Sequence, residues 1–195
     1  MTTTRLESFS DGVLAVAITL LVLDLNVPHS DLAHALRTQW PEYAAYVTSF
    51  LTVGIIWINH HVMIGRLRAV DHAVMFLNLL LLMSVVVIPF STNLMAEYLR
   101  ARTGEHLAAA VYGGSLLAMG LSFGAMHRYI LLGRHDLLAV ELPIAQRRRI
   151  FARAVSGVTP YVVATAAAPL SPYLTLGITF AVAVFYALPA ASTAG

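Results

Sequence analysis

The chain alternates between long apolar stretches and short polar connections, and this alternation predicts its elements. Six apolar stretches stand out, at residues 6–26, 41–64, 73–98, 106–132, 150–168 and 170–189, with the longest interior loop at 133–146. A helix rises about 1.5 Å per residue, so roughly 20 apolar residues cross the hydrocarbon of a bilayer. We therefore expect an all-α membrane protein with six transmembrane helices in a single domain, residues 1–189, and a short C-terminal tail, residues 190–195.

Prolines and small residues predict where these helices end and how they pack. Pro41 suits a first helical turn, and Pro89 predicts a kink inside the third stretch. After the first stretch, residues 31–38 predict a short helix capped by Ser30 or Asp31. The fourth stretch has a small-residue face with a G-x-x-x-G motif, which favours close helix packing. The glycines of this face are Gly113, Gly114, Gly120 and Gly124.

Composition supports the membrane assignment. The 195 residues are 58% hydrophobic and 11% charged, whereas globular domains have about 25% charged residues. The sequence has no cysteine, which excludes disulfides and thiolate chemistry. Its basic residues are all arginines and lie between the apolar stretches, so the pI of 9.2 indicates membrane orientation rather than nucleic-acid binding. Glu7 and Asp11 argue against a cleaved signal peptide at the N-terminus.

The arginines also predict how the chain is oriented. With the N-terminus in the cytoplasm, nine arginines lie on the cytoplasmic side and three lie outside, as the positive-inside rule requires. The outer three are Arg37, Arg100 and Arg102. The inner nine are Arg5, Arg66, Arg68, Arg128, Arg134, Arg147, Arg148, Arg149 and Arg153. An even number of spans then returns the C-terminus to the cytoplasm.

Polar residues gather near the cytoplasmic ends of the first three predicted helices. They are Ser10, Asp11, Trp57, Asn59, His60, His61 and Asn78. A carboxylate inside a membrane helix costs roughly 3 kcal/mol unless it is paired or hydrated. One interpretation of the group is a gate or proton-sensing cluster; the other is a hydrogen-bonded lock between the helices. His60 and His61 point about 100° apart, so we expect no metal site.

The first helix carries a second candidate feature, an apolar stripe. At about 100° per residue, Val16, Leu20 and Leu23 fall within a stripe roughly 60° wide, and Phe9 and Gly12 continue it toward the cytoplasm. The opposite face carries Leu14, Ile18, Leu21 and Leu25. Both faces are apolar, so periodicity alone does not say which face lines a pore and which packs.

Two polar residues favour a pore along the first helix. Thr19 borders the stripe as a lone hydroxyl at mid-membrane, and Asp24 places a carboxylate at the outer mouth. A carbonyl filter of the kind found in ordinary potassium channels is not expected. The T-V-G-I of residues 52–55 lacks the Tyr-Gly ending of that filter and lies in the middle of a predicted helix.

Three motifs resemble those of a known family. R-x-x-x-F-S-D spans residues 5–11 at the start of the first helix, T-L-L-V-L spans residues 19–23, and W-I-N-H-H spans residues 57–61. Together with the six-span layout, they resemble the transmembrane protein 175 family, the lysosomal potassium channel and its prokaryotic relatives. The resemblance implies a potassium-permeable cation channel in the plasma membrane of a prokaryote, assembled as a homotetramer.

The resemblance also implies residue roles. In the family, the first helix lines the axis with rings of apolar side chains beside a threonine layer. By position, the rings fall on Val16, Leu20 and Leu23, and the threonine layer falls on Thr19. The family more often has Ile or Leu at position 16, so the smaller Val16 implies modest potassium-over-sodium selectivity. The family's network of the first three helices falls on Arg5, Phe9, Ser10 and Asp11. No cofactor is implied beyond the permeant potassium ion.

Other classes of protein fit the sequence less well. The alternative is a proton-coupled secondary transporter that uses Asp11, His60 and His61. Transporters usually place ionisable groups near the midplane and contain internal repeats, and this sequence shows neither. An enzyme is not expected, because no nucleophile–base pair or metal constellation is present in the sequence.

Overall fold

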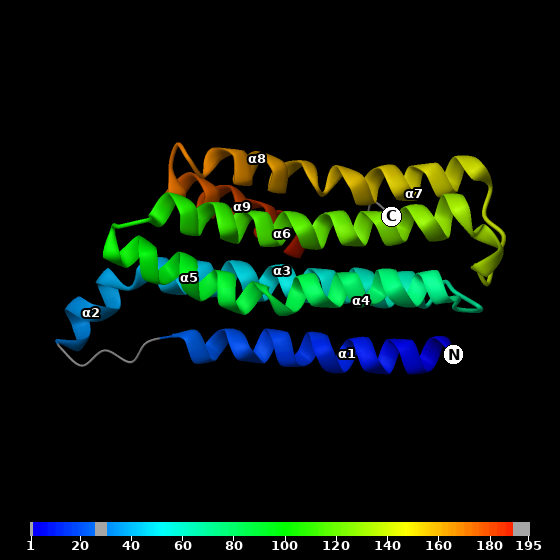
Figure 1. Ribbon diagram of the computed structural model, residues 1–195, viewed down its shortest axis with the longest axis horizontal. Coiled ribbons are helices and arrows are strands. Elements are labelled where there is room, and N and C mark those ends of the chain that lie inside the picture. The colour runs from blue at the N-terminus through cyan, green and yellow to red at the C-terminus, as the bar shows by residue number, and fades with distance from the viewer. Residues whose placement is uncertain (1, 26–30, 189–195) are drawn as a thin grey trace.

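The computed structural model describes residues 2–25 and 31–188, which form a bundle of helices (Figure 1). The longer helices are α1 (Thr3–Leu20), α2 (Leu32–Thr38), α3 (Trp40–Ile64), α4 (His72–Val86), α5 (Ile88–Ala101), α6 (Glu105–Arg128), α7 (Ile144–Ser156), α8 (Thr159–Ala167) and α9 (Pro172–Ala187). Short helical turns are η1 (Leu21–Asp24), η2 (Tyr129–Gly133) and η3 (His135–Leu137). Within the described residues, the only extended pairing is an isolated bridge between Leu67 and Leu138. The prediction of an all-α protein is therefore confirmed for this part of the chain.

Five helical stretches of the described residues are long and apolar enough to cross a membrane. They are Thr3–Leu23, Trp40–Ile64, His72–Ala101, Glu105–Gly133 and Ile144–Ala167. The apolar helix α9 has 16 residues, or roughly 24 Å at 1.5 Å per residue, and is shorter than these. The sixth span therefore stays a prediction. Residues 26–30 and the predicted tail, 190–195, lie outside the described residues.

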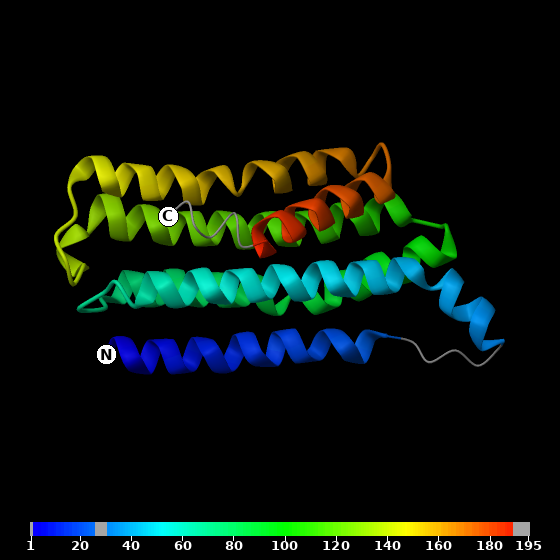
Figure 2. The same cartoon turned by 180° about the vertical axis from the view of Figure 1, so that it is seen from behind.

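The helices lie side by side, with α1 along one edge of the bundle and α7–α8 along the opposite edge (Figures 1 and 2). Between them lie α3, the α4–α5 pair and α6, and α9 packs against α3, α6 and α8. The first residues of α1, the α3–α4 turn and the α6–α7 loop lie at the same end of the bundle, which we call the N-terminal end. Helix α1 packs on its own chain mainly through α3 and α4.

Close packing between α6 and α8 explains the glycines of the fourth apolar stretch. A Cβ built on Gly113 would lie 2.9 Å from the Thr165 Oγ1, so any larger residue there would collide with α8. A Cβ on Gly120 would lie 3.5 Å from Tyr161, in ordinary contact. Gly114, by contrast, faces open space. The predicted small-residue face is thus a packing surface at Gly113 and Gly120.

The third apolar stretch is divided into two consecutive helices near Pro89. Helix α4 ends at Val86, and α5 begins at Ile88 with Pro89 in its first turn. Proline lacks a backbone N–H and sterically opposes the carbonyl one turn earlier, so the helical hydrogen bonds are interrupted there. The helix is thus interrupted at Val87, two residues before Pro89, while a change in the direction of its axis stays a prediction.

Helix α7 begins earlier than the sequence predicted. The loop was expected to end at Gln146 and the helix to begin near Ile150, but α7 begins at Ile144. The arginine run at residues 147–149, which the prediction left between the loop and the helix, therefore lies on the helix. Arg147 explains this difference, because its guanidinium donates to the Leu142 and Leu131 carbonyls, both at 3.0 Å, and closes the loop against the helix.

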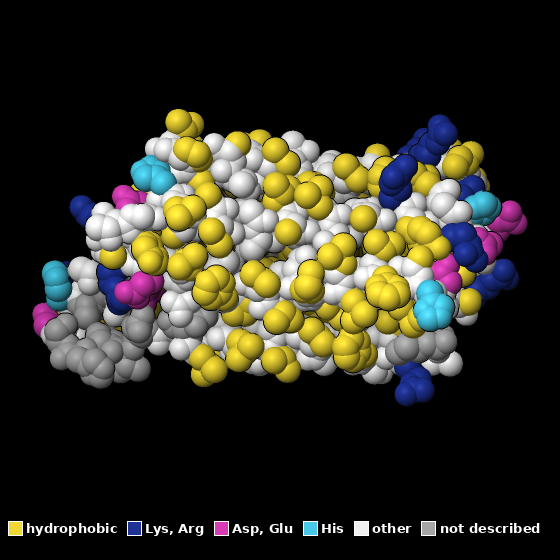
Figure 3. Space-filling view, in the orientation of Figure 1, with side chains coloured by type: hydrophobic (Ala, Val, Ile, Leu, Met, Phe, Trp, Pro, Cys, Tyr) yellow, Lys and Arg dark blue, Asp and Glu magenta, His cyan; other side chains and the backbone are white. Residues whose placement is uncertain are grey.

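The surface is divided as expected for a protein in a bilayer. Hydrophobic side chains cover the middle of the bundle and charged side chains gather at its two ends (Figure 3). Phe76, Met83 and Phe90 are among the exposed apolar side chains, and they follow one another at intervals of seven residues along α4–α5. Such a face suits contact with lipid or with another apolar surface.

Candidate functional site

Helix α1 packs one of its two apolar faces into its own chain. The buried residues of this face are Leu6, Ser10, Leu14, Ala17 and Leu21. Leu14 and Leu21 are only 2% and 1% exposed, and Ile18 is partly buried against the core. These positions recur every three or four residues, as a single helical face requires.

The other face of α1 is uncovered. Val16 is 57% exposed, Leu20 is 40% exposed and Leu23 is 75% exposed, and Phe9 and Gly12 are also exposed. This is the stripe singled out in the sequence. The described residues of one subunit place no protein over it.

The polar residues beside this stripe are arranged as follows. The Thr19 hydroxyl donates to the Val16 carbonyl at 2.9 Å, so it is satisfied within its own helix while remaining exposed. Asp24 ends η1, and its side chain lies outside the described part of the chain.

A buried chain of hydrogen bonds connects α1 to α3 through α4. The Ser10 hydroxyl donates to the Leu6 carbonyl at 2.9 Å, so its oxygen accepts the Asn78 Nδ2 at 2.9 Å. This assignment directs the Asn78 Oδ1 toward the His60 Nε2, 2.7 Å away. Since a carbonyl oxygen only accepts, the His60 Nε2 carries the proton in this bond. Ser10, Asn78 and His60 are fully buried.

This tautomer leaves the other ring nitrogen of His60 without a partner. The His60 Nδ1 is buried and has no hydrogen bond within the described residues. The ring is therefore held from one side, by Asn78, and it serves to fix that amide in place.

Two further contacts between α1 and α3 lie at the edge of this chain. The Trp57 Nε1 donates to the Asp11 Oδ1 at 2.9 Å, and the His61 Nδ1 lies 2.7 Å from the Glu7 Oε1. Glu7 was not among the residues predicted for this network. Its spacing could have revealed it, because Glu7 lies one turn before Asp11 and on the same face of the helix. With these contacts, the rotation of α1 about its own axis is fixed.

Three residues expected in this network are not brought to it within one subunit. The Asn59 amide donates at 2.8 Å to the Ile55 carbonyl of its own helix and is exposed, because it points about 100° away from His60. Arg5 is exposed, and no hydrogen bond or ion pair of its side chain occurs in the described part of the chain. Phe9 lies on the uncovered face of α1.

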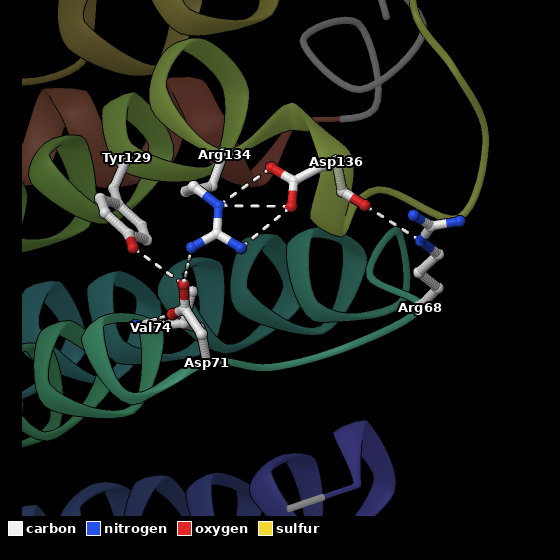
Figure 4. Close-up of polar contacts among 6 residues, drawn as sticks. All are labelled: Arg68, Asp71, Val74, Tyr129, Arg134 and Asp136. Carbon is white, nitrogen blue, oxygen red and sulfur yellow. Dashed lines mark hydrogen bonds and ion pairs between the residues drawn. The ribbon is translucent and has the colours of Figure 1, made fainter.

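A polar cluster at the N-terminal end joins the α3–α4 turn to the loop after α6 (Figure 4). Asp71 caps α4 by accepting the Val74 N–H at 2.9 Å, and it also accepts the Tyr129 hydroxyl at 2.8 Å and the Arg134 Nη1 at 2.9 Å. The Arg134 Nη2 donates to the Asp136 Oδ2 at 2.9 Å. The two loops are thus held together by a shared guanidinium.

The cluster keeps both carboxylates charged. Burial alone raises the pKa of Asp71, but the Val74 N–H, the Tyr129 hydroxyl and the Arg134 guanidinium favour the charged form, and the pKa falls below its ordinary 3.8. Hydrogen bonds from Arg134 likewise hold the pKa of Asp136 below its ordinary value. Among the described residues, no group of three or more His, Cys, Asp or Glu is arranged to hold a metal ion.

Comparisons with known proteins agree on one family. The family described as endosomal/lysosomal potassium channel TMEM175 matches residues 5–89. A potassium channel from Streptomyces collinus is 46% identical over 187 residues, which cover 93% of this chain and 90% of that protein. A potassium channel from Chamaesiphon minutus is 38% identical over 192 residues, covering 95% of this chain and 94% of that protein.

A solved structure has the same fold. The crystal structure of a lysosomal potassium-selective channel TMEM175 homologue from Chamaesiphon minutus superposes with a TM-score of 0.83 at 37% sequence identity. The match covers 95% of this chain and 96% of that one.

Proposed function

The chain belongs to the TMEM175 family of ion channels, and from this premise we propose that it forms a homotetrameric, potassium-permeable pore lined by α1. The chain contains helices that are long and apolar enough to span a membrane. Its family consists of ion channels rather than enzymes. In the proposed assembly, the termini lie in the cytoplasm of a prokaryote and the subunits sit in its plasma membrane. Val16, Leu20 and Leu23 form the constriction, Thr19 forms a hydroxyl layer between them, and Asp24 lies at the outer mouth.

The observation that carries the proposal is the uncovered apolar face of α1. Helix α1 lies at the edge of the bundle, with one face packed and the other exposed. Such a helix can line a pore only if copies of it meet around a symmetry axis. The contacts from Ser10, Asp11 and Glu7 hold α1 at one rotation relative to α3 and α4. A constriction made of particular side chains depends on such a fixed rotation, because a turn of 100° would replace each residue by its neighbour.

An apolar ring restricts ions through their hydration. A ring narrow enough to lose its water stops conduction by dewetting, and a slightly wider ring passes an ion that has shed part of its shell. Potassium holds its water less tightly than sodium and therefore meets the smaller barrier. The result is a modest preference for potassium without coordinating carbonyls. Val16 is smaller than Ile or Leu, which widens its ring and weakens the preference further.

A carbonyl filter has no support in this fold. Residues 52–55 lie within α3, an uninterrupted helix from Trp40 to Ile64. Helical carbonyls are engaged in hydrogen bonds along the helix and are not available to replace the hydration shell of an ion. This leaves the side chains of α1 to select the ion.

The proton-coupled transporter remains the alternative, and electrical recording distinguishes the two. Purified protein reconstituted into a bilayer should pass potassium down its gradient as unitary currents, with no proton gradient and no co-substrate. Flux that requires a proton gradient, or that saturates at slow turnover, would favour a transporter that uses Asp11, His60 and His61.

Substitutions on the two faces of α1 test which face meets the ion. Leu20→Ala shortens a side chain of the proposed constriction, so we expect a higher unitary conductance or a potassium-over-sodium preference lowered about twofold or more. Ile18→Ala is the matched control, because Ile18 is partly buried against its own chain. The control should alter stability or assembly rather than selectivity. A selectivity change in Ile18→Ala alone would mean that the other face lines the pore.

A further inference from the structure

Helix α7 carries basic residues that no acidic group within the described residues neutralises. Arg148, Arg149 and Arg153 are exposed, and within the described residues their guanidinium groups make no hydrogen bond or ion pair. Arg134 and Arg100, by comparison, are each paired with two carboxylates. The charge on α7 is therefore available to a partner outside the subunit.

The position of α7 makes lipid the expected neighbour. Helix α7 lies at the N-terminal end of the bundle, on the edge opposite α1 (Figures 1 and 2). Arginine side chains gather over this region in Figure 3, where apolar surface adjoins them. Arg153 lies nine residues after Ile144, roughly 14 Å along the helix at 1.5 Å per residue. An arginine at this depth can extend its guanidinium to the headgroup layer while its methylenes remain in apolar surroundings.

A pocket beside α7 has a largely apolar lining next to these arginines. Its volume is about 250 Å³, and Gln146 and Ile150 of α7 line one wall. The rest of the lining includes Leu138 and Leu142 of the loop before α7, and Arg66 of the α3–α4 turn. Arg66 is exposed, and its side chain also makes no ion pair within the described part of the chain.

Helical spacing brings the pocket and the basic residues onto one strip of α7. Arg149, Ile150 and Arg153 lie three, four and seven residues after Gln146, so all four lie on one side of the helix, within an arc of roughly 100°. The strip thus combines apolar lining, an amide and two unpaired guanidiniums, and Arg66 faces the pocket from the neighbouring turn.

We propose that this strip and pocket bind an anionic phospholipid of the cytoplasmic leaflet. The headgroup phosphate is held by Arg149 and Arg153, with Arg66 at the far side of the pocket, and the glycerol and first methylenes lie against Leu142 and Ile150. The apolar lining of the pocket favours an amphiphile over a free phosphate ion, because a free ion has no apolar surface to bury there. The assignment to the cytoplasmic leaflet rests on the proposed orientation of the chain, but lipid binding itself does not depend on the proposed conduction.

Lipid-dependent thermal unfolding tests the proposal. We would titrate the full chain in mild detergent with dioleoyl phosphatidylglycerol or dioleoyl phosphatidylcholine and follow the unfolding midpoint. The anionic lipid should raise the midpoint at lower concentration than the zwitterionic lipid, and salt should weaken its effect. Arg149→Gln/Arg153→Gln should weaken the apparent affinity for phosphatidylglycerol roughly 10- to 30-fold. Arg37→Gln/Arg102→Gln, which removes the same charge at the other end of the bundle, should change it less than about threefold.

The alternative outcomes are distinct. Equal stabilisation by the two lipids would overturn the proposal, and so would equal losses in the two double variants, since net charge alone would then explain binding. An equal effect of glycerol phosphate would show that a soluble phosphate occupies the site. If the glutamine variant does not fold, Arg149→Lys/Arg153→Lys keeps both charges and should retain the preference for phosphatidylglycerol.

Discussion

Asn78 is the residue on which the placement of α1 depends most. Its amide donates to Ser10 of α1 and accepts from His60 of α3, and neither contact is open to solvent. A buried polar group that loses its partner inside a membrane finds no water to replace it. One side chain on α4 therefore holds two other helices at a fixed rotation.

Removing this amide should destabilise the subunit strongly. Asn78→Ala leaves the His60 Nε2–H and one side of the Ser10 hydroxyl unpaired, so we expect the free energy of unfolding to fall by about 2–4 kcal/mol. Denaturant titration of the detergent-solubilised protein measures this change. Asn59→Ala is the control, because Asn59 is exposed and bonded only to its own helix, and it should cost less than about 0.5 kcal/mol. Equal effects of the two variants would refute the role given to Asn78.

At the scale of elements, two loops are joined by polar contacts rather than by hydrophobic packing alone. Arg134 is shared between Asp71 of the α3–α4 turn and Asp136 of the loop after α6. Backbone bonds from Arg68 to Leu137 at 2.9 Å and from Ala139 to Arg66 at 2.8 Å add to this junction. The relative positions of α4 and α6 at this end therefore depend on carboxylate charge.

The charge of these carboxylates predicts an acid-dependent contribution to stability. The pKa of Asp71 is lowered below 3.8, so the cluster stabilises the fold fully above about pH 4 and loses this contribution as the pH falls below that value. Arg134→Gln should be less stable than the wild type at pH 7, and the difference should shrink toward pH 3. The unfolding midpoint measured against pH tests this. Arg128→Gln, which removes an exposed arginine of α6, should show a small difference from the wild type at every pH, and a constant deficit in Arg134→Gln would contradict the account.

The elements that local sequence determines were the ones that could be predicted. Pro41 marks the start of α3 and Pro89 the break between α4 and α5, because proline acts on its own backbone. The start of α7 also has a local signal that the sequence analysis did not use, since Pro143 directly precedes its first residue. What could not be predicted is the contact of Arg147 with the Leu131 carbonyl, 16 residues earlier, because only the folded chain brings the two together.

The hydrogen-bond chain between α1, α4 and α3 was predictable to a similar extent. Ser10, His60 and Asn78 could be grouped because helix lengths place them at one depth, and the structure joins them by hydrogen bonds. Asn59 was included on depth alone, and depth does not give the direction in which a side chain points. Its spacing from His60 along the helix already excludes a shared partner.

At the scale of the whole molecule, the subunit is asymmetric. Helix α1 forms one edge with a bare apolar face, and α7–α8 forms the other edge with basic residues at one end (Figures 1 and 3). We interpret the first edge as turned toward a symmetry axis and the second as turned toward lipid. In the proposed channel, the permeation path lies between subunits, so conduction through it requires copies assembled with α1 at the centre.

The most direct measurement of this claim is the effect of a thiol reagent on the current of Leu23→Cys. The natural chain has no cysteine, so the introduced thiol is the only target. If Leu23 faces the permeation path, a water-soluble, positively charged methanethiosulfonate should reach it and suppress the potassium current. Phe185→Cys introduces a thiol at another exposed apolar position, on α9, and its current should be unaffected by the reagent. Undiminished current through Leu23→Cys channels whose thiols are fully modified would contradict the account.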